Sequence, residues 1–142
     1  MAAKSDVTVS WTGKKQFVGT DSTKHSVVMS AQDPENGTGV KPSDMLLVAL
    51  GGCSAVDIVS ILTKQRQTLT GLEVRISGEQ SDEKWPRPFE RIHVEYIVHG
   101  KGLSEKAVAR AIDLSEDTYC SVGATIRGVA EVTSSFQIVN EE

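Results

Sequence analysis

Two cysteines are the residues of this chain with the most distinctive chemistry. Cys120 follows Cys53 by 67 positions, a distance that excludes a Cys-x-x-Cys redox motif and leaves spatial pairing open. A thiol reacts as the thiolate, so its reactivity depends on the charges and the exposure around it. Lone cysteines are also common packing residues, and packing is the alternative role for both thiols.

The neighbours of Cys53 both favour and oppose a reactive thiol. Gly51 and Gly52 precede it, and a glycine pair either lets another backbone pack closely or opens space beside the thiol. Asp57 follows four residues later, so a helix would place it on the same face as Cys53. A carboxylate there would raise the pKa of the thiol, and a reactive Cys53 therefore needs a cation such as an arginine nearby.

One loop carries an arginine that could serve this purpose. The segment Trp85-Pro-Arg-Pro-Phe89 is either a rigid connector between strands or a loop that delivers Arg87 to a site. The histidines show no ligand spacing with either cysteine, and phosphate-binding and serine-nucleophile motifs do not occur. We expect neither a metal nor another cofactor.

A long apolar segment must position Cys53. Residues 45–62 comprise 18 positions, 13 of them apolar, and they predict a helix of about 27 Å. Pro42 lies near its start, with Ser43 or Asp44 as the N-cap. We reject a membrane span because Asp57 and two glycines interrupt the segment and no aromatic belt flanks it. A helix that is apolar on nearly all sides must be buried on nearly all sides, which favours a second subunit packed against it.

The remaining pattern predicts strands and shorter helices. Alternating apolar and polar residues indicate six strands: 7–11, 16–19, 25–29, 72–78, 92–98 and 131–139. Residues 107–114 predict a helix with Ser104 as its N-cap, and Ser115 caps a short helical piece that carries Cys120. Gly71 ends the long helix or forms the turn after it. This order favours an α+β fold, mainly antiparallel, with a curved sheet and the long helix across one face.

Composition is that of an ordinary soluble protein. The 142 residues predict a single domain, 1–142, with 39% hydrophobic and 24% charged residues. A net charge of −4 favours neither a nucleic acid nor an anionic membrane as partner. Residues 1–6 lack the apolar core of a secretory signal, so we expect the cytoplasm, where thiols stay reduced.

Two motifs resemble those of the OsmC/Ohr family. The family's first cysteine motif is similar to Pro42-Ser-Asp-Met-Leu-Leu-Val-Ala-Leu-Gly-Gly-Cys-Ser-Ala55, and its second is similar to Tyr119-Cys-Ser-Val122. The Pro-Arg-Pro-Phe loop, the Gly100-x-Gly-Leu-Ser104 turn and the strand order fit as well. The resemblance covers nearly the whole chain and is to the OsmC-like branch, not to Ohr itself. It implies an intertwined homodimer with antiparallel sheets wrapped around two central helices.

The resemblance also implies an activity. Characterised members of the family are thiol peroxidases that reduce organic hydroperoxides and serve oxidative-stress defence. Cys53 matches the peroxidatic cysteine, which becomes a sulfenic acid, and Cys120 matches the resolving cysteine, which condenses with it to a disulfide. A dithiol reductant then restores both thiols, and in the Ohr branch this reductant is a lipoylated protein.

Two positions depart from the family pattern. Catalytic members carry a glutamate directly after the motif proline, where this chain has Ser43 with Asp44 next. They also carry an arginine in the N-terminal strands, where this chain has only lysines, which lack the bidentate fork of arginine. Arg87 could substitute, from its own chain or from the other subunit. The residues assigned to the site are therefore Cys53, Cys120, Arg87, Asp57 and Asp44.

Three functions remain open at this point. The first is a homodimeric, cysteine-dependent reductase of organic hydroperoxides. The second is a non-catalytic OsmC-like protein that binds a small apolar molecule or senses redox state near Cys53, and the missing glutamate and arginine favour it. The third is a purely structural interaction protein, which only the burial expected for the long helix supports.

Overall fold

The chain folds into two compact units that share one long helix. The computed structural model describes residues 4–142, with a first unit that extends to Leu46 and a second unit from Leu47 to Glu142. The boundary falls inside helix α1 (Pro42–Lys64). The single domain expected for residues 1–142 stays a prediction.

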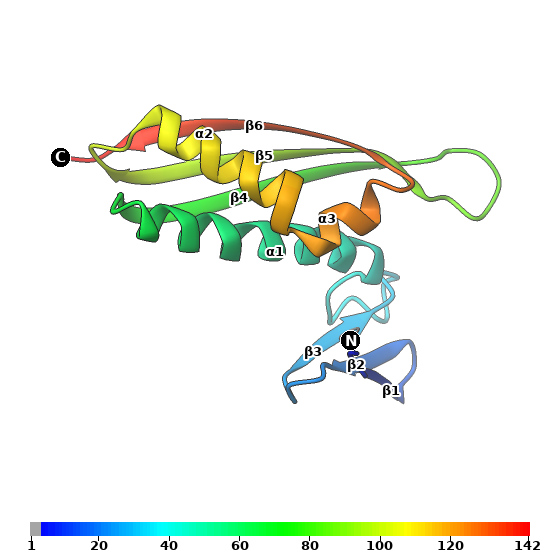
Figure 1. Ribbon diagram of the computed structural model, residues 1–142. Helices are drawn as coiled ribbons and strands as arrows, with labels where there is room; N and C mark the ends of the chain where they lie inside the picture. Colours follow the sequence, from blue (N-terminus) through cyan, green and yellow to red (C-terminus); the bar gives the residue numbers. More distant parts are fainter. Residues whose placement is uncertain (1–3) are drawn as a thin grey trace. The chain divides into compact units, whose positions relative to one another are not determined.

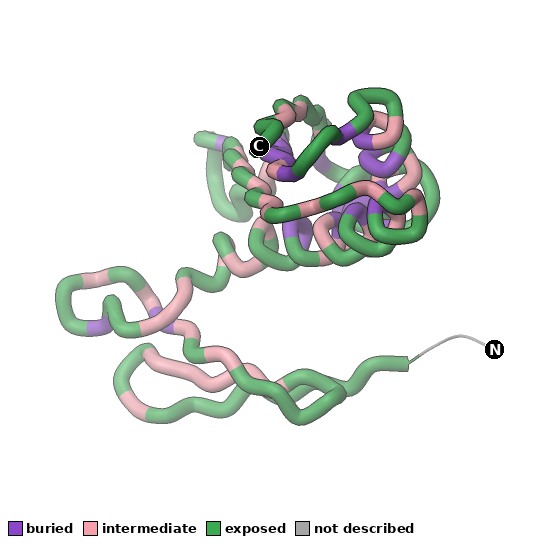
Figure 2. The backbone as a smooth tube through the Cα atoms, turned by 90° about the vertical axis from the view of Figure 1, so that its left-hand side faces the viewer, coloured by how far each residue is buried: buried purple, intermediate pink, exposed green. Residues whose placement is uncertain are grey.

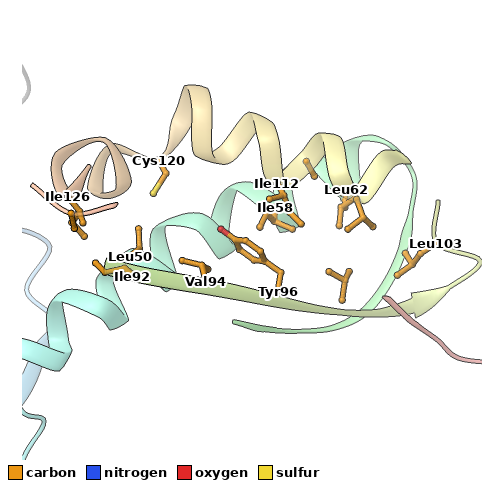
Figure 3. Packing of buried hydrophobic residues seen from close by; sticks show 14 residues of the cluster. Leu50, Ile58, Leu62, Ile92, Val94, Tyr96, Leu103, Ile112, Cys120 and Ile126 are labelled. Carbon is orange, nitrogen blue, oxygen red and sulfur yellow. The ribbon is translucent and has the colours of Figure 1, made fainter. Parts of the chain in front are cut away.

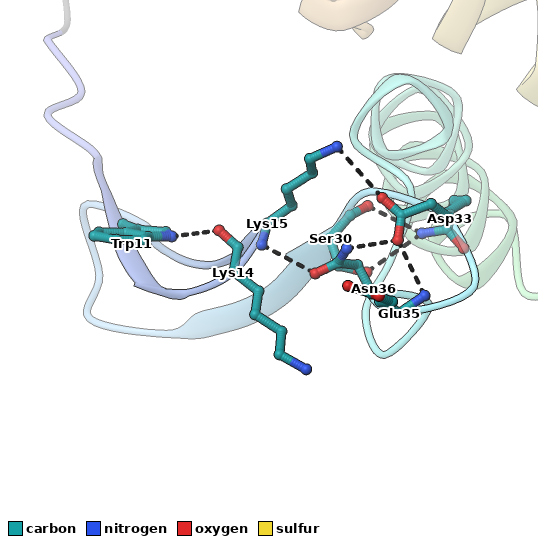
Figure 4. Close-up of polar contacts among 8 residues, drawn as sticks. Trp11, Lys14, Lys15, Ser30, Asp33, Glu35 and Asn36 are labelled. Carbon is teal, nitrogen blue, oxygen red and sulfur yellow. Dashed lines mark hydrogen bonds and ion pairs between the residues drawn. The ribbon is translucent and has the colours of Figure 1, made fainter.

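The first unit is a three-stranded antiparallel sheet with the order β1-β2-β3. Its strands lie where the alternation predicts them: β1 (Thr8–Gly13), β2 (Gln16–Thr20) and β3 (Ser26–Ser30). Lys14 makes the turn after β1 with a left-handed φ of 48°, and the Trp11 indole donates to its carbonyl at 2.6 Å. The loop after β3 is tied to this turn, because Lys15 N donates to buried Asn36 at 3.0 Å and Lys15 Nζ lies 3.5 Å from Asp33 (Figure 4).

Helix α1 is longer than predicted and buries one face. It begins at Pro42, so Ser43 and Asp44 lie inside its first turn and the expected N-cap at either residue is wrong. Its buried residues are spaced as one side of a helix: Leu50, Gly51, Ser54, Ile58 and Leu62. Other sides stay open, with Val48 56% and Val56 68% exposed. The chain by itself therefore does not bury α1 on nearly all sides.

By length and composition, α1 could also cross a membrane. The core helix of a soluble protein meets the same criteria, so this property alone is weak evidence for a span. The helix carries Ser54 on its buried face, and its Asp57 accepts a hydrogen bond from Ser115 Oγ at 3.0 Å. Polar groups with partners from another helix are typical of a protein interior, which agrees with our rejection of a membrane span.

The second unit is built on a sheet with the order β4-β5-β6. Strands β4 (Thr68–Gln80) and β5 (Phe89–Lys101) pair antiparallel, whereas β6 (Glu131–Asn140) runs parallel to β5. Parallel neighbours need a crossover connection, which the helical segment between β5 and β6 supplies. The expected, mainly antiparallel arrangement is confirmed, since three of the four strand pairs are antiparallel and only β5 with β6 is parallel.

Three helical pieces form this crossover (Figure 1): α2 (Glu105–Leu114), the π-helical turn η1 (Ser115–Tyr119) and α3 (Ser121–Ile126). Ser104 is the N-cap of α2, as predicted, and its side chain accepts from Ala107 N at 3.2 Å. Ser115 was expected to cap a second helix. It instead continues the helical path, and Cys120 is the residue that caps α3.

The core of the second unit lies where helices cover one face of the sheet (Figure 3). One cluster joins buried side chains of α1, α2 and β5. The alternation in β5 is confirmed, because its inward residues are at most 1% exposed: Ile92, Val94, Tyr96 and Val98. Figure 2 shows that buried residues are concentrated in this unit, whereas within residues 4–46 only Ser30 and Asn36 are buried.

Gly71 does not end the long helix. Helix α1 ends at Lys64, and the left-handed residue after it is Arg66, with a φ of 56°. Strand β4 begins at Thr68, so Gly71 lies within that strand, at a shift of its register against β5. Glycine is the usual residue at a helix end because it has no Cβ penalty in the left-handed region, but here neither the end of α1 nor the turn after it uses Gly71.

Candidate active site

Cys53 lies in the middle of α1 and is half-buried. A Cβ at Gly51 would lie 2.8 Å from Ile76 Cδ1 of β4, so glycine lets the sheet approach the helix. At Gly52 no atom apart from its chain neighbours and the backbone of its own helix lies within 4 Å of an added Cβ, and the residue is exposed. Close packing and open space, the two roles considered for the glycine pair, therefore belong to different glycines. Gly51 permits close packing, and Gly52 leaves the surface next to Cys53 open.

Cys120 lies between η1 and α3 and is only 4% exposed. Its Sγ accepts a hydrogen bond from Gly123 N at 3.3 Å, which caps the start of α3. The Ser54 hydroxyl donates to the same sulfur at 3.6 Å. Figure 3 shows the sulfur of Cys120 pointing toward α1. Because Ser54 directly follows Cys53, the two cysteine motifs meet inside the second unit.

The fold brings the two thiols into contact. The Cys53 thiol lies close enough to the Cys120 side chain and to the Val122 N–H of α3 for both groups to act on its pKa. Both cysteines are free thiols. The spatial pairing that the sequence left open is therefore present as a contact between reduced thiols. The disulfide that the family resemblance implies stays a prediction.

The surroundings of Cys53 favour its protonated form. Burial raises the pKa of the Cys53 thiol above its ordinary value of 9.0, and Cys120 and the Asp57 carboxylate raise it further. The Val122 N–H lowers this pKa because it donates to the sulfur and stabilises a thiolate. Asp57 thus acts in the direction that its spacing predicts, as the smallest of these causes.

A buried tyrosine extends the polar network behind the thiols. Tyr96 of β5 is 1% exposed, and its hydroxyl donates to Glu116 Oε1 at 3.2 Å, with the Ser54 side chain beside it. Burial raises the pKa of Tyr96, so the hydroxyl stays protonated. Ser54 therefore lies between Tyr96 and Cys120 and donates to the latter. Sequence reasoning missed both residues, since Tyr96 fits the inward face of a predicted strand and Ser54 is one more small residue in an apolar helix.

Arg127 is an arginine that contacts this network, through the backbone of Glu116. Sequence reasoning did not identify it. Its Nη1 donates to the carbonyl of Glu116 at 2.7 Å. A Cβ built at Gly123 would lie 3.4 Å from Arg127 Nη1 and also 3.4 Å from Cys120 Sγ. The arginine nitrogen and the cysteine sulfur are therefore at most twice 3.4 Å apart. Arg127 directly follows α3, and no residue pattern predicts that short helix.

Two residues assigned to the site lie elsewhere. Arg87 is in the exposed loop between β4 and β5, which extends past the end of the sheet (Figure 1). Its guanidinium stacks 4.7 Å from the centre of the Trp85 ring, and its Nε donates to Glu83 O at 2.9 Å. Asp44 is exposed in the first turn of α1, about two and a half turns before Cys53. Delivery of Arg87 by the other subunit stays a prediction.

A cleft of about 400 Å³ opens beside Asp57 in the second unit. Ile61 and Leu114 form its apolar walls, and Lys64 and Arg110 supply positive charge. Within residues 4–142, no three His, Cys, Asp or Glu side chains are placed to hold a metal ion. The groups available for chemistry are two thiols, the hydroxyls behind them and the carboxylate of Asp57.

Known proteins resemble this chain along most of its length. Residues 34–135 match the family model described as OsmC-like protein. The chain is 38% identical over 131 residues to Protein YhfA of Escherichia coli K12, which covers 92% of this chain and 96% of that protein. This relationship is close enough to establish the family.

Solved structures share the fold. A hypothetical protein from Aquifex aeolicus has a TM-score of 0.88 and 27% identity, with 99% of this chain and 100% of the other covered. The organic hydroperoxide resistance protein OhrB of Bacillus subtilis has a TM-score of 0.62 at 15% identity, with 95% and 98% covered. The likeness to OhrB concerns the fold alone. With its two cysteine motifs in contact, a matching family model and a relative aligned over nearly its whole length, the chain belongs to the OsmC family.

Proposed function

We propose that this protein reduces organic hydroperoxides, with Cys53 as the attacking thiol and Cys120 as the resolving thiol, in defence against oxidative stress. The observation that carries the proposal is the contact between two reduced thiols from distant motifs. Membership of the OsmC family supports it, as does the fold shared with OhrB, whose name refers to organic hydroperoxide resistance.

The reaction oxidises the thiol pair by two electrons. The Cys53 sulfur attacks the hydroperoxide oxygen, the O–O bond breaks, and the alkoxide leaves as an alcohol after it takes up a proton. The Cys120 sulfur then attacks the sulfenic sulfur of Cys53, so that an S–S bond forms and the hydroxyl leaves as water. A dithiol reductant, such as a lipoylated protein, restores both thiols by exchange.

The proposal includes a homodimer in the cytoplasm. Helix α1 exposes apolar side chains: Val48 at 56%, Val56 at 68% and Val59 at 41%. A second copy packed on this surface would remove it from water, which its own chain does not do. The cytoplasm supplies the reducing dithiols that the cycle requires.

Stoichiometric oxidation tests the proposal directly. Reduced protein is treated with one equivalent of cumene hydroperoxide, followed by intact-mass analysis and non-reducing peptide mapping. The wild type should form the Cys53–Cys120 disulfide, Cys120→Ser should stop at a sulfenic acid that dimedone traps, and Cys53→Ser should stay unchanged. Two unmodified thiols in the treated wild type would overturn the proposal.

A second function is favoured by the environment of Cys53, which raises the pKa of this thiol. In that function the protein binds a small apolar molecule beside Asp57 and does not use its thiols catalytically. Cys53→Ser should then leave the affinity for an apolar probe such as 1-anilinonaphthalene-8-sulfonate unchanged in a fluorescence titration. A loss of binding in this variant, together with peroxide-driven disulfide formation in the wild type, would exclude it.

A further inference from the structure

We propose that the cleft beside Asp57 is a binding site for an aliphatic monocarboxylate, with the carboxylate held by Lys64 and Arg110 and the apolar tail directed toward Cys53. The inference goes beyond the proposed peroxidase activity and does not rest on it, because neither thiol needs to react. It assigns a chemical class of ligand to a cleft that the proposed reaction leaves unused.

The cleft runs along the face of α1 that carries Cys53. Its volume is about 400 Å³, and its lining comes from the second half of α1, from α2 and from η1. Cys53, Asp57, Ser60 and Lys64 follow one another at steps of four, three and four residues, so they share one face of the helix. From Cys53 to Lys64 this face is about 16 Å long. The valines of α1 that we propose for the dimer contact do not line the cleft.

Positive charge lies at the end of the cleft away from the thiols. Lys64 is in the last turn of α1, Arg110 is in α2, and both side chains are exposed. Residues 4–142 contain six ion pairs, none of which uses Lys64 or Arg110. Both cations can therefore bind an anion, and the guanidinium of Arg110 can meet a carboxylate with two parallel N–H groups.

The side-chain amide of Gln65 adds a polar group next to Lys64 in the same cleft. Its Oε1 is buried and has no hydrogen-bond partner among the described residues. A buried polar atom without a partner costs free energy. Rotation of the amide exchanges its oxygen and its nitrogen, so the NH₂ group can turn toward a bound carboxylate. An anion at this end would thus give the amide a partner that the chain itself does not supply.

The middle of the cleft is apolar. Ile61 and Leu114 form its walls and are half-buried, and the ring of Tyr119 is 57% exposed toward the other end. An aliphatic chain on these side chains would leave water, which favours its binding. The cleft therefore suits an anion with an apolar tail better than a small hydrophilic anion.

The charge of Asp57 sets the direction of the ligand. Its carboxylate accepts from Ser115 Oγ at 3.0 Å and lies one helical turn after Cys53. A ligand carboxylate at this end would meet a like charge, whereas at Lys64 it meets an opposite one. The tail therefore passes Asp57 toward Cys53. Tyr119 directly precedes Cys120, so this end of the cleft adjoins both cysteine motifs.

Competition between ligands that share a tail tests the charge selectivity. cis-Parinaric acid, a fluorescent polyunsaturated carboxylate, is bound to the reduced wild type and displaced by decanoate, 1-decanol or decyltrimethylammonium. Decanoate should displace the probe at an about fivefold lower concentration than 1-decanol, and the cation should not compete. Added salt should weaken decanoate and leave 1-decanol unchanged. Equal displacement by decanoate and 1-decanol would overturn the inference.

Charge variants test the two cations. Lys64→Gln and Arg110→Gln should each raise the Kd for decanoate about fivefold, with a larger rise in the double variant, while the Kd for 1-decanol stays the same. Lys106→Gln is the matched control, because this lysine of α2 is equally exposed but does not line the cleft. Wild-type affinity for decanoate in the double variant would overturn the inference.

Protection of Cys53 tests the direction of the tail. Saturating decanoate should slow the alkylation of Cys53 by iodoacetamide, measured by peptide mass spectrometry, and Lys64→Gln/Arg110→Gln should lose this protection at the same decanoate concentration. An unchanged alkylation rate in the decanoate-bound wild type would refute the direction. Because no ligand here contains a peroxide bond, a failed oxidation experiment would leave the binding site standing, and failed binding would leave the proposed peroxidase standing.

Discussion

Cys53 and Cys120 carry the same side chain but have different neighbours. Cys53 lies half-buried on a helix near a carboxylate, and Cys120 is buried at a helix start with a hydroxyl and an N–H on its sulfur. Spacing alone predicts the approach of Asp57, because residues four apart share a helix face. Ser54 reaches Cys120 through a tertiary contact that no local pattern reveals, and Arg127 lies near Cys120 because the short helix α3 joins them.

Removal of the Asp57 charge should make Cys53 more reactive. In Asp57→Asn the pKa of the Cys53 thiol falls, because one cause that raises it is gone. At neutral pH the thiolate fraction and the rate of iodoacetamide alkylation at Cys53 should rise roughly threefold. Peptide mass spectrometry measures the rate. Asp113→Asn on the exposed side of α2 is the control, and equal rates in both variants would contradict the prediction.

Tyr96 should make the fold sensitive to alkali. Its folded-state pKa lies above the ordinary value of 10.0, so the folded chain holds this proton more strongly than the unfolded chain. Its contribution is therefore complete below that value and is lost as pH rises through the folded-state pKa. Urea unfolding of reduced protein at about pH 8 and pH 11 should show this loss.

The matched variants separate this effect from other alkaline titrations. Tyr96→Phe should show a smaller loss between the two pH values, and at neutral pH it should cost about 1–2 kcal/mol for the hydrogen bond to Glu116. Tyr119→Phe, whose side chain is 57% exposed, should behave like the wild type. Identical alkaline losses in Tyr96→Phe and Tyr119→Phe would refute the assignment.

At the scale of elements, the helices and strands agree closely with the residue pattern, and their ends agree less well. The six expected strands are present, but β4 and β5 each extend several residues beyond the alternating segments. Pairing between neighbours extends a strand past its own pattern, because every added ladder bond satisfies two backbone groups. The short helix α3 escapes prediction because its cap is a cysteine and its six residues are too few for a period.

Gly100 should be essential to the end of β5. A Cβ at this residue would collide with the carbonyl oxygen of Thr68 in β4 and lie 2.7 Å from the Leu103 side chain. Gly100→Ala should therefore lower the free energy of unfolding by about 2–4 kcal/mol. Chemical denaturation measures this, with Gly128→Ala as control, since the nearest atom to its Cβ is 3.4 Å away. Equal stability of the two variants would show that the strand end can shift.

At the scale of the whole molecule, helix α1 determines what the chain needs from outside. One face is buried in its own core, while Val56 stays 68% exposed on another. The expectation that the helix is buried on nearly all sides is therefore met only in part by a single chain. The homodimer that we propose would complete this burial.

Val56→Glu should weaken self-association. A carboxylate at the centre of an apolar contact loses water without gaining a partner, so dimers should dissociate at least tenfold more readily. Sedimentation velocity over a concentration series measures the change. Val129→Glu is the matched control, because this valine is 73% exposed and lies outside α1. A dimer of unchanged strength in Val56→Glu would place the interface elsewhere or exclude it.

Much of the candidate site could be predicted because motif and periodicity are local properties. Cys53, Asp57 and Cys120 were identified from residue type and spacing, and the structure places them together. Arg87 and Asp44 were assigned for their charge, but charge does not say where a loop or a helix start lies. Arg87 instead stacks on Trp85 in its own loop.

The sequence by itself determined the family resemblance, the α+β class, the apolar helix and the inward residues of β5. These follow from motif and period, which are carried by neighbouring residues. Only the tertiary structure decided that β6 runs parallel to β5, that Ser54 and Gly123 donate to Cys120, and that Arg127 is the nearby arginine. The β5–β6 pairing and the Ser54–Cys120 bond join residues far apart in the chain, which the crossover through α2, η1 and α3 brings together. The contacts of Gly123 and Arg127 with Cys120 depend on the short helix α3 that lies between them.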